Sequence, residues 1–172
     1  MKNIVLIGFM ATGKTTIGRW LARRLKREFI DTDAEIERLT GKTVAQIFAG
    51  DGGVRFRSEE DLLVKRLAGR EGLVIATGGG LVLNPDNLRL LKENGVLVAL
   101  TASPEIIYNR VSSKKSRPLL LTGDIKNKIK ELLRERENTY KTAEITIDTG
   151  NCSIEDTAGQ ITRYLLERNY II

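Results

Sequence analysis

The sequence predicts an α/β protein in which a parallel sheet is covered by helices on both faces. Two observations carry this prediction. Short, almost continuously apolar runs end in turn-forming or polar residues, and longer stretches of helical periodicity lie between them. Such apolar runs are typical of parallel strands that are buried on both faces. Strands that alternate with helical stretches of about 10 to 15 residues form βαβ units, which build a parallel α/β sandwich.

Five apolar runs are the expected strands, and they comprise residues 4–7, 29–30, 73–76, 96–100 and 145–147. The helices are expected between them. Apolar residues recur at helical spacing from Ile17 to Leu25. Ser103 before Pro104 is a typical helix start, and Ser153 opens the last helix.

Two stretches depart from this alternation. Residues 32 to about 67 have a helical pattern throughout, and residues 112–123 are polar and basic and contain Pro118. Insertions of this kind usually hold the binding residues and a moving lid. Because neither repeats nor a low-complexity linker occur, we expect one domain over residues 1–172.

The composition excludes several kinds of chemistry. The 172 residues include no His and one Cys, Cys152. The chain therefore has no His general base, no Ser-His-Asp triad, no His-ligated metal, no internal disulfide and no Cys-rich zinc site. Carboxylates, Lys, Arg, hydroxyls, backbone N–H groups and an oxygen-bound cation remain available.

The charge and the apolar runs bear on partners and location. No run approaches the roughly 18 apolar residues of a membrane span. The apolar start is followed at once by a glycine-bracketed loop with Lys14, which disfavours a signal peptide. We therefore expect a cytoplasmic protein, and its size suggests a monomer. The net charge of +6 favours anionic ligands, but the nine aromatic residues suggest no base-stacking surface, so nucleic acid is not an expected partner.

The strongest motif is residues 8–15, Gly-Phe-Met-Ala-Thr-Gly-Lys-Thr, which fits G-x-x-x-x-G-K-[ST]. It follows the first strand and opens a helix, as a phosphate-binding loop (P-loop) requires. Lys14 is expected to reach the β- and γ-phosphates of a nucleotide, and Thr15 to ligate Mg²⁺. The alternative, a glycine-rich turn with a solvated lysine, is disfavoured by this context.

Asp31 and Asp33 follow the second strand, at the sheet edge where ligands bind. One can hold Mg²⁺ through water, and the other can orient a substrate hydroxyl or accept its proton. The alternative role is an N-cap for the next helix.

Further candidates are glycines or basic residues. The run from Thr77 through Gly80 allows a ligand to approach bare backbone, although it also suits a flexible turn. Glu60, three residues after Arg57, can orient the Arg57 guanidinium group toward a carboxylate ligand; alternatively, the two residues form only a surface ion pair. Arg136 is a second anion ligand or a helix-surface charge. The basic run that includes Arg110, Lys114, Lys115 and Arg117 closes over a triphosphate or is a solvated loop.

A P-loop alone does not separate kinases, GTPases and motor ATPases, although the N-K-x-D tetrad of small GTPases is absent. Six motifs together resemble those of shikimate kinase in order and spacing over essentially the whole chain. They are G-F-M-A-T-G-K-T-T, D-T-D, F-R-S-E-E, T-G-G-G, S-R-P-L-L and R-E-N-T-Y.

This resemblance implies ATP-dependent phosphorylation of the shikimate 3-hydroxyl, on the route to chorismate and the aromatic amino acids. It also implies a nucleoside monophosphate kinase-like, three-layer α/β/α sandwich with a five-stranded parallel sheet and a P-loop. The implied catalytic residues are Lys14, Asp33 and Arg117. The implied ATP ligands are Ala11, Thr12, Gly13, Lys14, Thr15, Thr16, Arg110 and Arg117, with Arg110 near the adenine. The implied shikimate ligands are Asp33, Arg57, Gly78, Gly79, Gly80 and Arg136. Mg²⁺, the implied cofactor, would be held by Thr15 and, through water, by Asp31.

The chain departs from the family pattern at a few positions. Ala11 replaces a frequent glycine, which we expect to be tolerated only at negative φ. Gly53 stands where the family often has Glu, Asn138 replaces a common proline, and the proline often found at the adenine edge is missing from residues 150–153. These changes concern the adenine contacts and substrate affinity rather than the reaction.

Two alternatives remain open. Another small-molecule kinase of the same build, such as a gluconate kinase, would also bind a carboxylate and hydroxyls. The second alternative is a regulatory module that binds a nucleotide but has lost turnover. Such modules often lose a catalytic residue, whereas this chain retains Lys14, Thr15, Asp31, Asp33 and Arg117.

Overall fold

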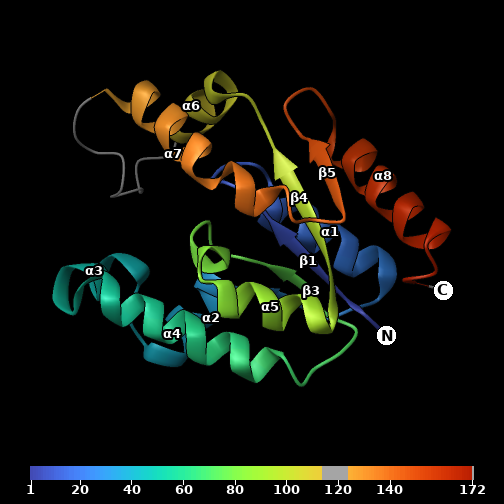
Figure 1. Ribbon diagram of the computed structural model, residues 1–172, viewed down its shortest axis with the longest axis horizontal. Helices are drawn as coiled ribbons and strands as arrows, with labels where there is room; N and C mark the ends of the chain where they lie inside the picture. Colours follow the sequence, from blue (N-terminus) through green and yellow to red (C-terminus); the bar gives the residue numbers. More distant parts are fainter. Residues whose placement is uncertain (114–123, 172) are drawn as a thin grey trace.

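The computed structural model describes residues 1–113 and 124–171, and it is the predicted α/β sandwich. Alternation of strands and helices begins with β1 at the N-terminus and ends with α8 (Figure 1). In chain order the elements are β1 (Asn3–Ile7), α1 (Lys14–Leu25), β2 (Phe29–Asp31), α2 (Thr32–Thr40), α3 (Val44–Gly50), α4 (Gly52–Leu67), β3 (Val74–Ala76), the 3-10 helix η1 (Leu81–Leu83), α5 (Pro85–Glu93), β4 (Gly95–Thr101), α6 (Pro104–Ser112), α7 (Ile125–Tyr140), β5 (Ile145–Asp148) and α8 (Ile154–Glu167).

The five strands form one parallel sheet in the order β2-β3-β1-β4-β5. The predicted five-stranded parallel sheet is therefore confirmed. Successive residues of a strand point to opposite faces. In β1, Val5 and Ile7 accordingly enter one buried cluster, whereas Ile4 and Leu6 enter the other.

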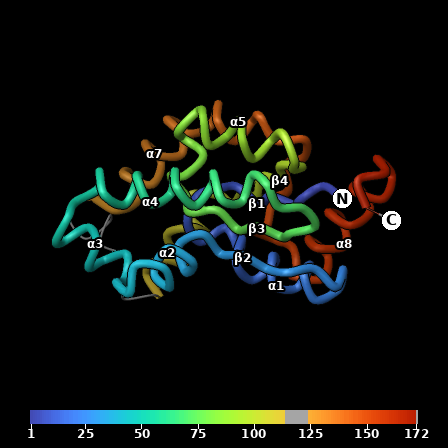
Figure 2. Tube along the Cα trace, turned by 90° about the horizontal axis from the view of Figure 1, so that it is seen from below, coloured from blue at the N-terminus to red at the C-terminus, as the bar shows by residue number. Residues whose placement is uncertain are grey.

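The two faces of the sheet are covered by different helices, which gives the three layers. Helices α1 and α8 pack on the face of Ile4 and Leu6. Helices α2 to α7 all contribute buried residues to the cluster on the face of Val5 and Ile7. Figure 2 shows α1 and α8 below the sheet and α4, α5 and α7 above it. No helix in the described ranges has the length and apolar character needed to span a bilayer.

Polar groups start most of the helices, as their sequences predict. Ser103 and Ser153 accept hydrogen bonds from the backbone N–H groups of Ile106 and Asp156, and each caps the helix that follows. The region with a helical pattern between residues 32 and 67 is three helices, α2, α3 and α4, separated by short turns.

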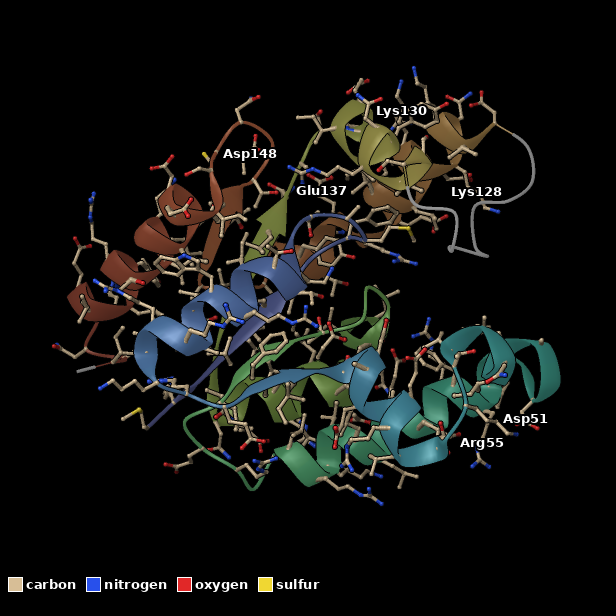
Figure 3. The ribbon with its side chains drawn as sticks, turned by 180° about the vertical axis from the view of Figure 1, so that it is seen from behind. Asp51, Arg55, Lys128, Lys130, Glu137 and Asp148 are labelled. Carbon is tan, nitrogen blue, oxygen red and sulfur yellow. The ribbon has the colours of Figure 1, made fainter. Side chains whose placement is uncertain are left out.

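All five strands run in the same direction, so their carboxyl ends meet at one edge of the sheet. Figure 1 shows α2, α3 and α4 extending beyond this edge on one side, and α6 and α7 on the other. Figure 3 shows Asp51 and Arg55 in the first group of helices, and Lys128 and Lys130 on α7 in the second. Of the expected site residues that the structure describes, Asp33 and Arg57 lie on α2 and α4 in the first group, and Arg110 and Arg136 lie on α6 and α7 in the second.

Candidate active site

The segment between β1 and α1 closes tightly on the end of the sheet. Gly8 has φ +142°, and a Cβ on it would lie 2.3 Å from the carbonyl oxygen of Leu100. Gly13 has φ +97° and is the N-cap of α1. Because side chains are excluded at Gly8 by contact and disfavoured at Gly13 by conformation, the glycines of the motif set the shape of the loop.

The N-terminus of α1 is left open to an anion. No side chain among the described residues caps this end, and no acidic residue lies in its first turn. The first amides of a helix and its dipole attract negative charge. The Nζ atom of Lys14 donates to the carbonyl oxygens of Gly8 and Phe9 at 2.8 and 2.7 Å, which places the ammonium group against the loop. This arrangement suits the phosphates of a nucleotide.

The expectation of a negative φ at Ala11 is wrong. Its φ is +60°, in the left-handed region. A residue with a Cβ pays about 1–2 kcal/mol for this conformation. The carbonyl oxygen of Ala11 accepts a hydrogen bond from Arg110 Nη1 at 3.0 Å, which helps to hold the loop in place.

Arg110 joins the P-loop to the segment that follows β5. Its Nη2 donates to the carbonyl oxygen of Thr149 at 2.8 Å, and the Thr149 hydroxyl donates to the carbonyl oxygen of Thr12 at 2.8 Å. Its expected role toward the adenine stays a prediction. So does the role of Thr16, which is exposed in the first turn of α1. Arg117 lies outside the described residues, as does most of the expected lid, 114–123.

Thr15 and Asp31 fit a magnesium ion. The Thr15 hydroxyl donates to Asp31 Oδ2 at 2.6 Å, so the two side chains present neighbouring oxygens beside the P-loop. Mg²⁺ prefers oxygen ligands and is usually bound through one or two carboxylates together with substrate phosphates and water. Asp31 Oδ1 accepts from the backbone N–H groups of Asp33 and Ala34, both at 3.2 Å, so Asp31 is also the N-cap of α2.

Three predicted side chains from three helices meet at the glycines that follow β3. A Cβ at Gly78 would lie 2.5 Å from Asp33 Oδ1, and one at Gly80 would lie 2.5 Å from Arg57 Nη2. These two glycines are therefore needed for Asp33 and Arg57 to approach the backbone.

At the glycine between them, Gly79, a Cβ would lie 3.6 Å from Arg136 Nη1 and 3.7 Å from the backbone nitrogen of Met10. The segment Gly78, Gly79 and Gly80, here called the glycine triplet, thus lies against the P-loop.

Buried carboxyl groups surround this point. Asp33 Oδ1 and Glu60 Oε1 are buried without a hydrogen-bond partner among the described residues. Burial, reinforced by the nearby Asp31 charge, raises the pKa of Asp33. Glu60 Oε2 accepts from Arg57 Nη1 at 2.5 Å, but burial outweighs this contact and raises the pKa of Glu60 to about 7. Unpartnered buried oxygens facing a site are available to a ligand's hydroxyl groups.

Sequence reasoning missed two residues that hold the glycine triplet. The hydroxyl of Thr32, which is fully buried, accepts from the backbone N–H of Gly78 at 2.8 Å. The hydroxyl of Tyr140 donates to the carbonyl oxygen of Gly79 at 3.1 Å. Both residues lie inside recognised motifs, D-T-D and R-E-N-T-Y, but nothing local in the sequence indicates a backbone partner so far along the chain.

Comparison with known proteins gives a consistent result. A family model described as shikimate kinase matches residues 10–166. The shikimate kinase of Pelotomaculum thermopropionicum is 67% identical over 171 residues, which cover 99% of each chain. That of Desulforudis audaxviator is 57% identical over 171 residues, which cover 99% of this chain and 90% of the relative.

Among solved structures, some resemble this chain in both sequence and fold, and others resemble it in fold alone. The shikimate kinase of Acinetobacter baumannii in complex with shikimate superposes with a TM-score of 0.93 at 40% identity, covering 98% of this chain and 94% of that one. A gluconokinase from Sinorhizobium meliloti gives a TM-score of 0.58 at 16% identity over 97% of both chains, which is a likeness of fold alone. On the family match and the sequence identities, this chain belongs to the shikimate kinase family.

Proposed function

We propose that this protein transfers the γ-phosphoryl group of ATP to the 3-hydroxyl of shikimate, giving shikimate 3-phosphate and ADP on the route to chorismate. One observation carries the proposal. Asp33, Arg57 and Arg136 come from three different helices and converge on the glycine triplet, which adjoins the P-loop. Such a site offers carboxylate, guanidinium and backbone groups to one small polyhydroxy acid beside a nucleotide.

The two arginines account for binding of the shikimate carboxylate. The planar guanidinium group of arginine matches a carboxylate with two parallel hydrogen bonds. Glu60 fixes one edge of Arg57 through Nη1. Arg136 approaches from α7 and lies over the ring of Phe9, with 5.4 Å between its Cζ atom and the ring centroid. The backbone of the glycine triplet, and of Gly79 in particular, completes the part of the site proposed to bind shikimate, here called the acid-binding side.

Asp33 is proposed to orient the attacking hydroxyl. In the transfer, the 3-oxygen of shikimate bonds to the γ-phosphorus, the bond from that phosphorus to the bridging oxygen of ADP breaks, and Asp33 accepts the hydroxyl proton. Phosphoryl transfer has a loose transition state, so alignment and charge neutralisation supply most of the catalysis. Since proton transfer is late in such a reaction, positioning is the main role of Asp33.

The nucleotide is proposed to bind along the P-loop. The backbone of Ala11, Thr12, Gly13 and Thr16 would surround the phosphates, and Lys14 would neutralise their charge, joined by Arg117 from the expected lid. Arg110 would face the adenine. Mg²⁺, held by Thr15 and through water by Asp31, would supply charge neutralisation at the β- and γ-phosphates. A monomer is the proposed catalytic unit.

The test is ADP release with ATP and magnesium against a panel of acceptors: shikimate, quinate, gluconate, AMP and none. We expect strong turnover only with shikimate. Turnover with gluconate alone would retain the P-loop roles and remove the assignments of Arg57, the glycine triplet and Arg136. Tight ATP binding without turnover on any acceptor would instead favour a regulatory module.

A further inference from the structure

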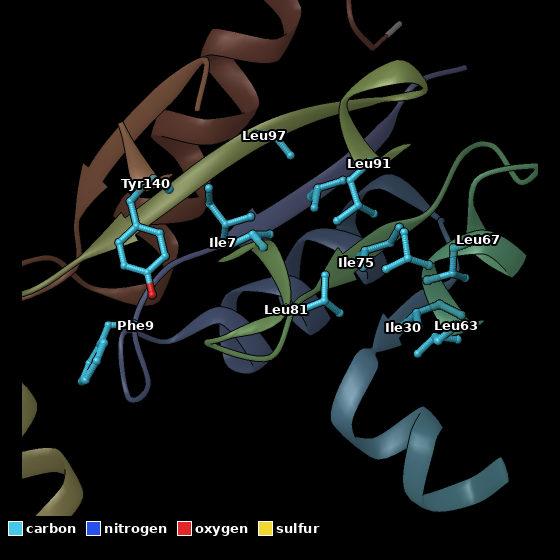
Figure 4. Packing of buried hydrophobic residues seen from close by; sticks show 14 of the residues in the cluster. Ile7, Phe9, Ile30, Leu63, Leu67, Ile75, Leu81, Leu91, Leu97 and Tyr140 are labelled. Atoms are coloured by element: carbon cyan, nitrogen blue, oxygen red, sulfur yellow. The ribbon is translucent and has the colours of Figure 1, made fainter. Parts of the chain in front are cut away.

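The carbonyl oxygen of Gly79 accepts two hydrogen bonds from α7. Tyr140 donates its hydroxyl at 3.1 Å, and Arg136 donates Nη1 at 3.3 Å. Tyr140 is 6% exposed and belongs to the same buried cluster as Phe9 and Leu81. Figure 4 shows Tyr140, Phe9 and Leu81 as members of this cluster, and close packing of a buried ring restricts its movement.

These two bonds set the direction of a peptide plane. In a trans peptide the C=O of one residue and the N–H of the next point in opposite directions. With the Gly79 carbonyl turned toward α7, the N–H of Gly80 points away from α7. On the other side of Gly79, the N–H of Gly78 is held by Thr32.

The remaining amides of the glycine triplet are available to a ligand. No acceptor among the described residues bonds the N–H of Gly79 or of Gly80, and both glycines are partly exposed. The guanidinium group of Arg57 lies directly beside Gly80. A substrate oxygen that reaches Arg57 is therefore close to an amide whose direction α7 controls.

Tyr140 and Arg136 differ in what they do when substrate binds. In the proposed function Arg136 turns to the shikimate carboxylate and leaves the Gly79 carbonyl. Tyr140 is buried and stays, and burial raises the pKa of its hydroxyl, which remains a donor at neutral pH. Glycine has no side chain to restrain its own peptide planes.

We propose that Tyr140 is a positioning residue for shikimate: its hydroxyl holds the Gly79 carbonyl and thereby keeps the Gly80 amide directed at the substrate once Arg136 has engaged the carboxylate. This inference rests on the proposed function. It assigns to Tyr140 an effect on shikimate binding and none on the nucleotide, because in the described part of the chain this hydroxyl bonds the Gly79 carbonyl and no P-loop residue.

The test compares Tyr140→Phe with Tyr164→Phe. The Tyr164 hydroxyl also donates to a backbone carbonyl at 3.1 Å, that of Glu144, which directly precedes β5. Tyr164 packs on the other face of the sheet from Tyr140. For Y140F we expect the KM for shikimate to rise roughly tenfold, the effect of losing one hydrogen bond, with kcat and the KM for ATP within about twofold. For Y164F all three constants should stay within about twofold of wild type.

Melting temperature and calorimetric shikimate binding accompany the kinetics. Arg136 still reaches the Gly79 carbonyl in unliganded Y140F, so we expect this variant to fold and to show the weaker binding directly. An unchanged shikimate KM and affinity in Y140F would overturn the inference, as would equal rises in the KM values for ATP and shikimate. Absence of shikimate turnover in the wild type would be a failure of the proposed function instead.

Discussion

Asp31 and Asp33 are separated by one residue but have opposite surroundings. Both oxygens of Asp31 are engaged, one by Thr15 and the other by the first amides of α2. Asp33 Oδ1 is buried without a partner in the described part of the chain, and its pKa is raised. This contrast supports the proposed division of roles, in which Asp31 holds a cation and Asp33 accepts a hydrogen bond from a substrate hydroxyl.

Replacing Asp33 by Asn tests this division. Asn keeps the size of the side chain but cannot take a proton or present a charge to the attacking hydroxyl. We expect kcat to fall by about 10²–10⁴-fold in D33N, with the affinity for ATP nearly unchanged. Steady-state kinetics and nucleotide titration measure the two effects. The control is Asp51→Asn, which removes the carboxylate of an exposed ion pair with Lys42 and should leave both quantities nearly unchanged. Turnover at the wild-type rate would remove the assigned role of Asp33.

Among elements, the P-loop contains a conformational strain that its motif does not reveal. The pattern G-x-x-x-x-G-K-[ST] specifies Gly8 and Gly13 and leaves the fourth position free, yet Ala11 has φ +60°. The sequence therefore predicted the loop and its place after β1, but not the backbone conformation of a residue between the two glycines. That conformation depends on contacts with Arg110, 99 residues further along the chain.

Ala11→Gly should relieve this strain. Removing the left-handed penalty outweighs the greater freedom that glycine gives the unfolded chain, so we expect the free energy of unfolding to rise by about 0.5–1 kcal/mol. The matched control is Ala45→Gly, an exposed position in α3, where the same change should lower it by about 0.5–1 kcal/mol. Chemical denaturation measures both, and a destabilised A11G would show that Ala11 is unstrained.

Strand positions were predicted more completely than their arrangement. Each apolar run is a strand in the structure, because burial on both faces needs continuous apolar residues. The order β2-β3-β1-β4-β5 and the bonds of Thr32 and Tyr140 to the glycine triplet were beyond the sequence pattern. They depend on which segments meet in three dimensions, and no local periodicity records this.

At the scale of the whole molecule, the acid-binding side of the site reduces stability at high pH. Glu60 is 1% exposed, and its pKa is raised from 4.5 to about 7. Between pH 4.5 and about pH 7, Glu60 keeps its proton in the folded protein but has released it in the unfolded chain. The folded state is then stabilised at low pH, and this stabilisation is lost as pH rises through about 7.

Glu60→Gln isolates this contribution. Gln has the same shape and can still accept from Arg57, but it does not titrate. Between pH 5 and pH 8 we expect wild type to lose about 2–3 kcal/mol of unfolding free energy relative to E60Q. Glu59→Gln, which removes the carboxylate paired with Arg55 on the same helix, is the control. If wild type instead gained unfolding free energy relative to E60Q as pH rises, the ion pair with Arg57 would have a larger effect on the pKa of Glu60 than burial has.

The contact between the glycine triplet and the P-loop has a consequence for inhibitor design. A Cβ at Gly79 would lie 3.7 Å from the backbone nitrogen of Met10 and 3.9 Å from the carbonyl oxygen of Gly8, so the walls of the two proposed substrate sites touch. A bisubstrate inhibitor therefore needs only a short, stiff bridge between its acid and its nucleotide. Short bridges give a high effective concentration of the second group once the first has bound. The length of the linker would therefore influence the affinity of such an inhibitor as well as the choice of its two end groups.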